Sequence, residues 1–488
     1  MLAVCSKTPG VFAAQPTLTT ADFTAVDAYI AAQMKAARIP GVALAVVQGE
    51  EIIYLKGYGV ADPSGRPVTP QTPFMLASTV KPMTALAVMQ LVEAGQIDLD
   101  APVQQYLPWF RVGNISDAAH ITIRHLLNHT SGLPTASGDE VPPSTDMGAD
   151  ALENRVRRLN AVQLNRPVGE RFEYSSANYD ILGLIVQTVS GQSYETYIQE
   201  HIFKPLEMQR TFTSLAEAEP HGLAIGYRSW FGFPIPFDGP HPRAYAPSGW
   251  AVSSTAEDLA HLAIAQLNEG RYGDTAVLSA DGIAAMYQPT VQSYSPTQYS
   301  SLGWNISPIA DVQTIGAGGD AANFRSRLLL VPQHNLGLVV LMNMNTVDLN
   351  AGYFEFYKGI LNLLLNQLPP EVQTPHYQLT FIPLLVILLV TLVIVVAMIR
   401  AIMKLRRWPL MPERRAHNWR ATFQQTGPHL VLHLAWTALL LIGFPLIAGR
   451  SLFFLILYIP DLGYTLLASA ALALVWSLYR MVWVRRLQ

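Results

Sequence analysis

Residues 72–95 read TPFMLASTVKPMTALAVMQLVEAG, and this stretch predicts a buried helix with a serine and a lysine in its first turn. The residue before Pro73 is expected to be extended, because proline disfavours the helical region at the preceding position. Pro82 falls where the first helical turn tolerates proline. Residues 84–92 are apolar on nearly every side, which is typical of a helix inside a large core. Gly95 is the expected end of the helix.

Ser78 and Lys81 are three residues apart, so a helix places them on one face, one turn apart. The lysine amine then lies beside the serine hydroxyl. If Ser78 opens the helix, the positive helix end stabilises an oxyanion and disfavours the charge on Lys81. This arrangement makes a hydroxyl nucleophilic. The pair taken alone favours an ordinary exposed first helical turn, and only the motifs that follow reverse that interpretation.

A second motif, FEYSSANY at residues 172–179, precedes an apolar helix predicted over residues 181–189. Beside a lysine ammonium, the pKa of the Tyr174 phenol falls, so this group can act as a general base for a serine on another segment. The alternative interpretation is an aromatic side chain that caps a core helix. The motif by itself favours that alternative.

The two motifs belong to a longer set of stretches that resembles the serine β-lactamase-like superfamily, which contains class C β-lactamases, penicillin-binding proteins, D-amino-acid peptidases and related esterases. The similar stretches follow the expected order at residues 72–81, 121–133, 167–183, 248–259 and 318–343. The resemblance covers roughly residues 25 to 367. It implies that Ser78 is the acylated nucleophile, that Lys81 is its proton partner, and that Tyr174 is the base that also serves the leaving group.

Two positions depart from the family pattern. The tyrosine motif usually reads Tyr-x-Asn, and Ser176 stands in the third position here. In a third motif, IGAGGD at residues 315–320, Ala317 occupies the position of the usual lysine or histidine. The resemblance thus implies activity that is reduced, redirected to substrates with uncharged ends, or lost.

The remaining site predictions also rest on the second and third motifs. Glycines allow close approach of a substrate, and the N–H of Asp320 is expected to complete an oxyanion hole with that of Ser78. The residues predicted to bind substrate or the oxyanion are Ser176, Asn178, Ala317, Gly318, Gly319 and Asp320. We expect no metal and no cofactor. His429 and His433 have a metal-ligand spacing, but no third ligand is evident, and we interpret them as interfacial histidines.

The predicted fold is α+β: an antiparallel β-sheet flanked by helices, with a helical subdomain, followed by three transmembrane α-helices. Strands at 42–47 and 52–55 flank Gly49-Glu50, and strands at 327–331 and 338–341 flank residues 332–335, so each pair predicts a hairpin. A helix is expected at 353–368. We interpret residues 230–247 either as a pocket rim or as a plain long loop, and His125 and His129 as structural residues beneath the site.

Three uncharged stretches in the C-terminal part, at 377–399, 428–449 and 462–479, are long enough to cross a bilayer as helices. Residues 452–459 are an apolar segment expected near the interface. The predicted domains are a leader or truncated signal region at 1–18, a serine hydrolase domain at 19–368, a linker at 369–378 and a three-helix membrane domain at 379–488. Cys5 is the only cysteine, so no intrachain disulfide exists.

The charge pattern predicts the orientation. Residues 400–420 contain seven Lys and Arg against one Glu, and Arg480, Arg485 and Arg486 follow the third stretch. The positive-inside rule places both segments in the cytoplasm and the hydrolase domain outside. Residues 1–378 contain 21 Lys and Arg and 33 Asp and Glu, so this acidic part is a poor candidate for nucleic acid. The basic loop suits anionic lipids of the inner leaflet.

These observations predict a bacterial serine hydrolase or peptidase, anchored in the cytoplasmic membrane, that forms an acyl-enzyme with an amide or ester. The expected partners are the lipid bilayer and a small peptide or acyl-amino-acid substrate; the oligomeric state is open. Residues 174–180, YSSANYD, also resemble the prodrug-activating D-amino-acid peptidases of the colibactin-maturing type. An esterase and a weak β-lactamase remain alternatives. A rival of another class is a pseudoenzyme that binds or senses a ligand.

Overall fold

The computed structural model describes residues 20–113, 115–138, 146–238, 243–249, 251–346, 350–372, 378–406, 419–448 and 451–487. The chain forms two compact units. The first contains residues 1–227, 236–345 and 352–373, and the second contains residues 228–235, 346–351 and 374–488. We describe each unit separately.

An eight-stranded antiparallel sheet organises the first unit, in the order β2-β1-β14-β13-β12-β11-β10-β9. Both predicted hairpins are confirmed. One joins β1 (Gly41–Gln48) to β2 (Glu51–Gly59), and the other joins β13 (Arg325–Val331) to β14 (Leu336–Met342). The remaining strands of the sheet are β9 (Val291–Gln292), β10 (Tyr299–Ser301), β11 (Trp304–Ile309) and β12 (Val312–Asp320).

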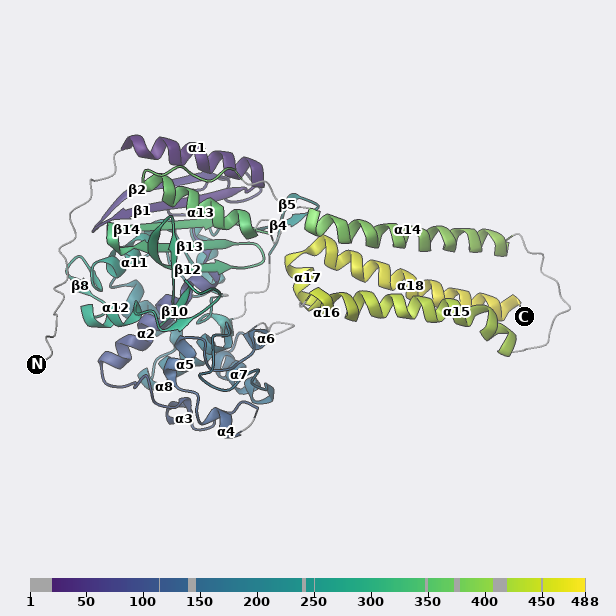
Figure 1. Cartoon of the computed structure of the whole chain (residues 1–488), viewed down its shortest axis with the longest axis horizontal. Helices are drawn as coiled ribbons and strands as arrows, with labels where there is room; N and C mark the ends of the chain where they lie inside the picture. Colours follow the sequence, from purple (N-terminus) through teal and green to yellow (C-terminus); the bar gives the residue numbers. More distant parts are fainter. Residues whose placement is uncertain are drawn as a thin grey trace, which may run out of the picture. The chain divides into compact units, whose positions relative to one another are not determined.

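Helices cover both faces of this sheet, as Figure 1 shows. On one face, Tyr29 of α1 (Thr20–Ala37) donates a hydrogen bond of 2.9 Å to the carbonyl of Glu355 in α13 (Asn350–Leu364). On the other face, α11 (Ala256–Leu267) packs against β1 and β14. Helix α13 starts and ends earlier than the predicted 353–368, and Asn366, with φ of +57°, lies in the left-handed region just beyond it.

A helical part supplies the rest of the first unit. Its central member, α8 (Ala177–Ser190), is almost entirely buried over its first ten residues and ends at Gly191, whose left-handed backbone is the usual helix stop. The shorter helices of this part are α3 (Val103–Tyr106), α4 (Ile115–Ala118), α5 (Ile123–Leu127), α6 (Thr135–Gly138), α7 (Ala151–Arg158) and α9 (Tyr194–Ile198). The predicted α+β fold with a helical subdomain is therefore confirmed.

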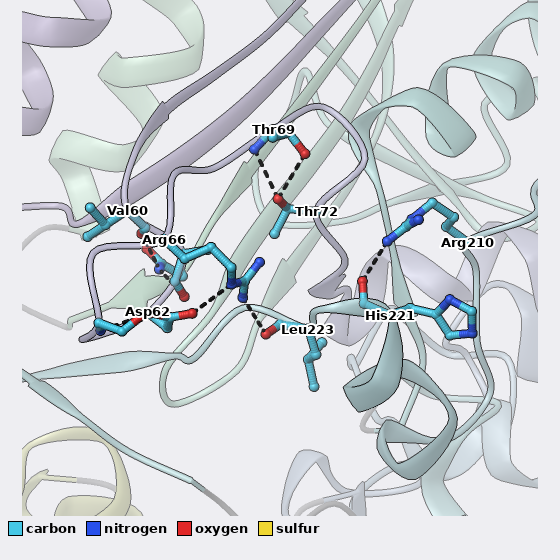
Figure 2. Close-up of polar contacts among 11 residues, drawn as sticks. Val60, Asp62, Arg66, Thr69, Thr72, Arg210, His221 and Leu223 are labelled. Carbon is cyan, nitrogen blue, oxygen red and sulfur yellow. Dashed lines mark hydrogen bonds and ion pairs between the residues drawn. The ribbon is translucent and has the colours of Figure 1, made fainter.

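The loop that follows β2 is fixed by polar contacts (Figure 2). The Arg66 guanidinium donates to the Asp62 carboxylate at 2.7 Å and to the Leu223 carbonyl at 3.0 Å. The Thr69 N–H donates to the Thr72 hydroxyl at 2.9 Å. The bond from Arg66 to Leu223 joins two chain segments, one that leads to the first sequence motif and one that leads to strand β4 (Tyr227–Trp230), and the other two bonds fix the first of these segments.

Residues 230–247 differ from both sequence interpretations. They contain the second half of a hairpin formed by β4 and β5 (Phe233–Pro236), followed by a short 3₁₀ turn at Arg243–Tyr245. None of the described residues that line the pocket at Ser78 comes from this stretch. Its described part is therefore not a plain loop, and residues 239–242 lie outside the described residues.

The second unit contains three helices that are long and apolar enough to cross a membrane. The qualifying segments are Phe381–Arg400, Leu430–Ala448 and Pro460–Tyr479. Only 11% of the first segment is buried, so most of its apolar side chains face outward, as they would toward lipid. The described helices are α14 (Gln378–Arg406), α15 (Trp419–Ala438), a π-helical turn at Leu439–Gly443, α16 (Phe444–Ala448), α17 (Leu452–Tyr458) and α18 (Pro460–Leu487).

Polar contacts join these helices inside the second unit. The Ser469 hydroxyl of α18 accepts hydrogen bonds from Thr391 at 2.7 Å and from the Trp436 indole at 3.1 Å. His433 contacts the Ser477 hydroxyl at 2.9 Å. Side-chain hydrogen bonds of this kind join helices within membranes.

Candidate active site

The first motif folds into a strained turn that presents Ser78. Strand β3 (Phe74–Met75) leads into a 3₁₀ turn at Ala77–Val80, and helix α2 (Lys81–Glu93) follows. Ser78 therefore lies at the start of the helical segment, as expected, and the first turn of that segment is a 3₁₀ turn that continues directly into α2. Ala77, directly before the serine, has a φ of +48°, which is rare for a residue with a side chain. Residues three apart eclipse one another in a 3₁₀ turn, which aligns Ser78 with Lys81.

Lys81 is buried and donates three hydrogen bonds around the serine. Its Nζ lies 2.8 Å from Ser78 Oγ, 2.8 Å from the carbonyl of Ser248, and 3.4 Å from Ser176 Oγ. An ammonium has three protons, so these acceptors use its full donor capacity. Lys81 also lies over the ring of Tyr174, 5.1 Å from its centre, where a cation is stabilised by the aromatic face.

The second motif brings its tyrosine to the same serine. The Tyr174 hydroxyl lies 2.7 Å from Ser78 Oγ, and either oxygen can donate. Tyr174 immediately precedes the turn into α8, and its neighbours anchor it, since the Ser175 N–H donates to His129 Nδ1 at 3.2 Å. The Glu173 N–H donates to the His129 carbonyl at 2.8 Å. The structure thus places Lys81 and Tyr174 each within hydrogen-bond distance of Ser78 Oγ.

Asn178 does not face the substrate side of the pocket. It is fully buried, its Oδ1 accepts a 2.6 Å hydrogen bond from Ser131, and its Nδ2 lies 3.1 Å from His129 Nδ1. These bonds hold the histidine and the start of α8 together. The structure therefore gives Asn178 a positioning role in place of the predicted substrate contact, whereas Ser176 lies beside Lys81 as expected.

His129 lines the pocket at Ser78, although the sequence favoured a structural role beneath it. Its ring centre lies 4.6 Å from that of Tyr174. Burial, together with the nearby charge of Lys81, lowers the pKa of His129 to about 3, so the imidazole is neutral at physiological pH. Since Nδ1 accepts from the Ser175 N–H, the ring proton is on Nε2. No sequence signal separates this pocket histidine from a packing residue.

Strand β12 carries the third motif along the pocket. Ala317 and Gly318 line it with Ser78, whereas Gly319 and Asp320 line a second small cavity. The Asp320 carboxylate pairs with Arg325 at 2.7 Å, so this side chain is neutralised by its own hairpin. Ala317 is 3% exposed and brings no charge. Among the described residues that line the pocket, Lys81 and His129 are the basic ones.

The close packing around position 319 leaves no room for a side chain, so only glycine fits there. A Cβ built there would lie 1.9 Å from the Leu76 carbonyl oxygen, directly before the turn that carries Ser78. The Ser326 hydroxyl reinforces this contact, since it donates to the same carbonyl at 2.5 Å and lies 2.8 Å from Thr79 Oγ1. β12 is therefore held directly against the nucleophile turn.

One wall of the pocket was not predicted. Ser300, Gly303, Trp304 and Asn305, at β10 and the start of β11, line it. Trp304 is 1% exposed, and within the described part of the chain its indole N–H has no hydrogen-bond partner. The residues come from strands far from both catalytic motifs in sequence, so no local pattern assigns them to the site.

Comparisons with known proteins agree with this geometry. The family model described as Beta-lactamase matches residues 26–353, which include Ser78, Lys81 and Tyr174. Protein flp of Staphylococcus aureus (strain MW2) is 32% identical over 330 residues, which are 66% of this chain and 63% of that protein. The match thus spans less than two thirds of the length of flp.

Two further similarities cover more of the relative's length. Penicillin-binding protein 4 of Amycolatopsis lactamdurans is 31% identical over 345 residues, covering 69% of this chain and 89% of that protein. Among solved structures, the octameric penicillin-binding protein homologue from Pyrococcus abyssi superposes with a TM-score of 0.62 at 26% identity, covering 73% of this chain and 80% of that one.

Proposed function

Since the chain belongs to the β-lactamase family of serine hydrolases, we propose that it cleaves an amide or ester through an acyl-enzyme on Ser78. The observation that carries this proposal is that both Tyr174 and Lys81 contact the hydroxyl oxygen of Ser78. Ser78 Oγ lies 2.7 Å from the Tyr174 hydroxyl and 2.8 Å from Lys81 Nζ. A nucleophile within hydrogen-bond distance of its base, with that base held by further contacts, is the arrangement that activates a serine.

The hydrogen bonds support a division of roles between Tyr174 and Lys81. An ammonium that donates to Ser78, Ser176 and Ser248 has no lone pair, so Tyr174 is the group that accepts the proton of the serine. Tyr174 acts in its phenolate form, so the proton transfer moves the negative charge from the phenol oxygen to Ser78 Oγ, and the Lys81 ammonium stabilises it there. The serine oxygen attacks the carbonyl carbon, and Tyr174 then returns the proton to the leaving amine or alcohol.

The tetrahedral intermediate needs donors for its oxyanion. We assign the backbone N–H groups of Ser78 and Asp320 to this role, because β12 is held against the nucleophile turn at Gly319. After the leaving group departs, water attacks the acyl ester with Tyr174 again as base, and Ser78 is regenerated.

The substrate that suits this pocket is uncharged beyond the scissile bond. Ala317 is buried and apolar where the family pattern has a cation, and His129 is neutral. A carboxylate there would lose its hydration without gaining an ion pair, which is costly. We favour an amide or ester of a D-amino-acid-containing peptide or an exported acyl-D-amino-acid prodrug, as in the colibactin-maturing type. Esterase and weak β-lactamase activities use the same residues.

A pseudoenzyme is the second candidate, and Ala317 is the observation that favours it. The hydrolase proposal predicts that a substrate is turned over, whereas the pseudoenzyme proposal predicts binding without turnover. A panel of N-acyl-D-amino-acid amides, the matching L-amides, neutral esters and a chromogenic cephalosporin should reveal at least one hydrolysed class, and that activity should vanish in Ser78→Ala. Binding without turnover of any class, and without acylation of Ser78, would favour the pseudoenzyme.

We propose further that α14, α15 with α16, and α18 cross the cytoplasmic membrane and that the hydrolase faces outward. The three apolar segments support the crossings, and the basic residues 400–420 support the orientation. Single cysteines in a Cys5→Ser background test this in whole cells. Thr275→Cys should react with an impermeant maleimide, and Arg415→Cys should react only after the membrane is opened. The reverse pattern would overturn the orientation.

A further inference from the structure

The tip of the β4–β5 hairpin has an unusual composition for an exposed turn. Residues 229–237 read SWFGFPIPF and contain no charged residue. Phe231, Phe233 and Ile235 are 37%, 59% and 47% exposed. Aromatic and aliphatic side chains gathered on one exposed turn indicate a surface that meets an apolar environment.

The turn itself breaks a local rule. Phe231 and Gly232 connect the two strands with φ values of +49° and +80°, the conformation in which both central residues have positive φ. Asn, Asp or Gly usually occupies the first of these positions, because a bulky residue is strained there. A phenylalanine in this position makes the tip more apolar at a cost in local stability, which points to a contact made by the tip.

Within the second unit, the hairpin tip is bonded to the start of the third candidate span. The Arg228 guanidinium donates to the carbonyls of Ile456 and Leu457, at 3.1 and 3.0 Å, near the C-terminus of α17. A cation suits this position, because the last carbonyls of a helix carry partial negative charge. The Phe231 N–H donates to the Asp461 carboxylate at 3.2 Å.

An aromatic contact adds to these bonds and indicates the depth of the tip. Trp230 packs on Tyr464, with ring centres 5.5 Å apart, and Tyr464 lies in the second turn of the segment Pro460–Tyr479. Tryptophan and tyrosine concentrate where apolar chains meet lipid headgroups. Asp461, at the beginning of the same segment, belongs at the polar boundary.

We propose that the tip of the β4–β5 hairpin, residues 230–235, enters the headgroup–acyl boundary of the bilayer on the side where α18 begins. This inference rests on the proposed function, in which three helices cross the membrane. It adds a second kind of lipid contact, made by residues 230–235, which do not cross the bilayer. Lipid is favoured as the occupant because the tip is continuous with a candidate span, uncharged and aromatic, as interfacial elements are.

The residues that flank the hairpin in sequence have hydrogen bonds of their own within the first unit. In the first unit, the Tyr227 N–H donates to the carbonyls of Asn323 and Asn343, and the Phe237 N–H donates to the Gly226 carbonyl. The Asn323 side chain donates to the Phe237 carbonyl at 2.8 Å. Asn323 follows β12, the strand that lines the pocket. Residues 226, 227 and 237, on either side of the tip in sequence, are therefore held within the first unit, two of them by Asn323.

Depth-dependent quenching of single labelled cysteines tests the proposal. In the Cys5→Ser background, Phe233→Cys and Ile235→Cys carry an environment-sensitive fluorophore, and the full chain is reconstituted in phosphatidylcholine–phosphatidylglycerol vesicles. Thr275→Cys, on the exposed β7–β8 hairpin (Arg271–Tyr272 and Thr275–Ala276), is the aqueous control. Leu389→Cys, 53% exposed near the middle of the first candidate span, is the lipid control.

We expect both hairpin labels to be quenched more by a doxyl group near the lipid headgroup than by one near the chain end, and to be shielded from iodide. The Leu389 label should respond most to the deep doxyl group, and the Thr275 label to iodide alone. Hairpin labels that respond like Thr275 would overturn the proposal. Labels shielded from both iodide and doxyl lipids would overturn it too, since a second copy or a protein partner would then cover the tip. If Leu389 also escapes doxyl quenching, the membrane spans themselves fail.

Discussion

Replacing Gly319 with alanine tests whether β12 is held against the nucleophile turn. The new Cβ would lie 1.9 Å from the Leu76 carbonyl oxygen, whereas ordinary contacts begin at 3.4 Å. The strand and the turn must therefore separate by about 1.5 Å, because both contacting groups are backbone and neither can rotate away. The Ser326 hydroxyl, 2.5 Å from the same Cβ position, limits the available relief.

The separation should cost both stability and rate. Overpacking in a tight core costs about 1–3 kcal/mol. A misplacement of about 1 Å between reacting groups lowers rates about 10²-fold, and here it would move the Asp320 N–H away from the oxyanion formed at Ser78. We expect Gly319→Ala to lower the second-order rate of acylation by a fluorophosphonate at least that much, while the melting temperature falls modestly.

Two other glycines provide graded comparisons. In Gly318→Ala, the new Cβ meets the end of the flexible Arg327 side chain at 2.7 Å, so a smaller loss is expected. In Gly337→Ala, in β14 of the same sheet, the nearest atoms are side-chain carbons at 3.2 Å, and the acylation rate should stay close to that of the wild type. A Gly319→Ala protein that is acylated as fast as Gly337→Ala would refute the packing argument and the oxyanion assignment that depends on it.

Lys81→Ala and Tyr174→Phe should each lower kcat by roughly 10²–10⁴-fold, and the double variant should be little worse because the residues act as one unit; multiplicative losses would contradict this. Ala317→Lys should raise kcat/KM for a carboxylate-bearing substrate more than for its neutral amide, and equal changes would show that position 317 does not contact the carboxylate. The pKa of buried His129 is about 3, below the ordinary 6.5, so the unfolded chain binds a proton that the folded chain rejects. Stability should therefore fall between about pH 6.5 and 3, by roughly 5 kcal/mol at most, and His129→Gln should lose less in that window; melting temperatures of the two proteins that fall in parallel with pH would exclude this role.

The sequence predicted those features that are encoded locally. Alternating strands around Gly49, the Ser78–Lys81 spacing and the three uncharged C-terminal stretches each lie within one short segment. Their signals come from side-chain periodicity and from hydropathy, which need no knowledge of distant residues.

Other features depend on backbone conformation or on distant contacts. Nothing in the sequence signals the left-handed backbone of Ala77, so the 3₁₀ turn before α2 could not be foreseen. The β4–β5 hairpin lacks the Asn-Gly signal, because Phe231 stands at the first turn position. His129 and Trp304 reach the pocket through long-range packing, which a single sequence does not reveal.

The central claim is that Ser78 forms an acyl-enzyme, and intact-mass analysis of the full-length protein tests it most directly. After incubation with a fluorophosphonate or a penicillin, we expect one added mass that peptide mapping places on Ser78 and that is absent from Ser78→Ala. An adduct that persists in Ser78→Ala would contradict acylation of Ser78. A wild-type protein that is folded but gains no adduct with any probe would contradict it as well.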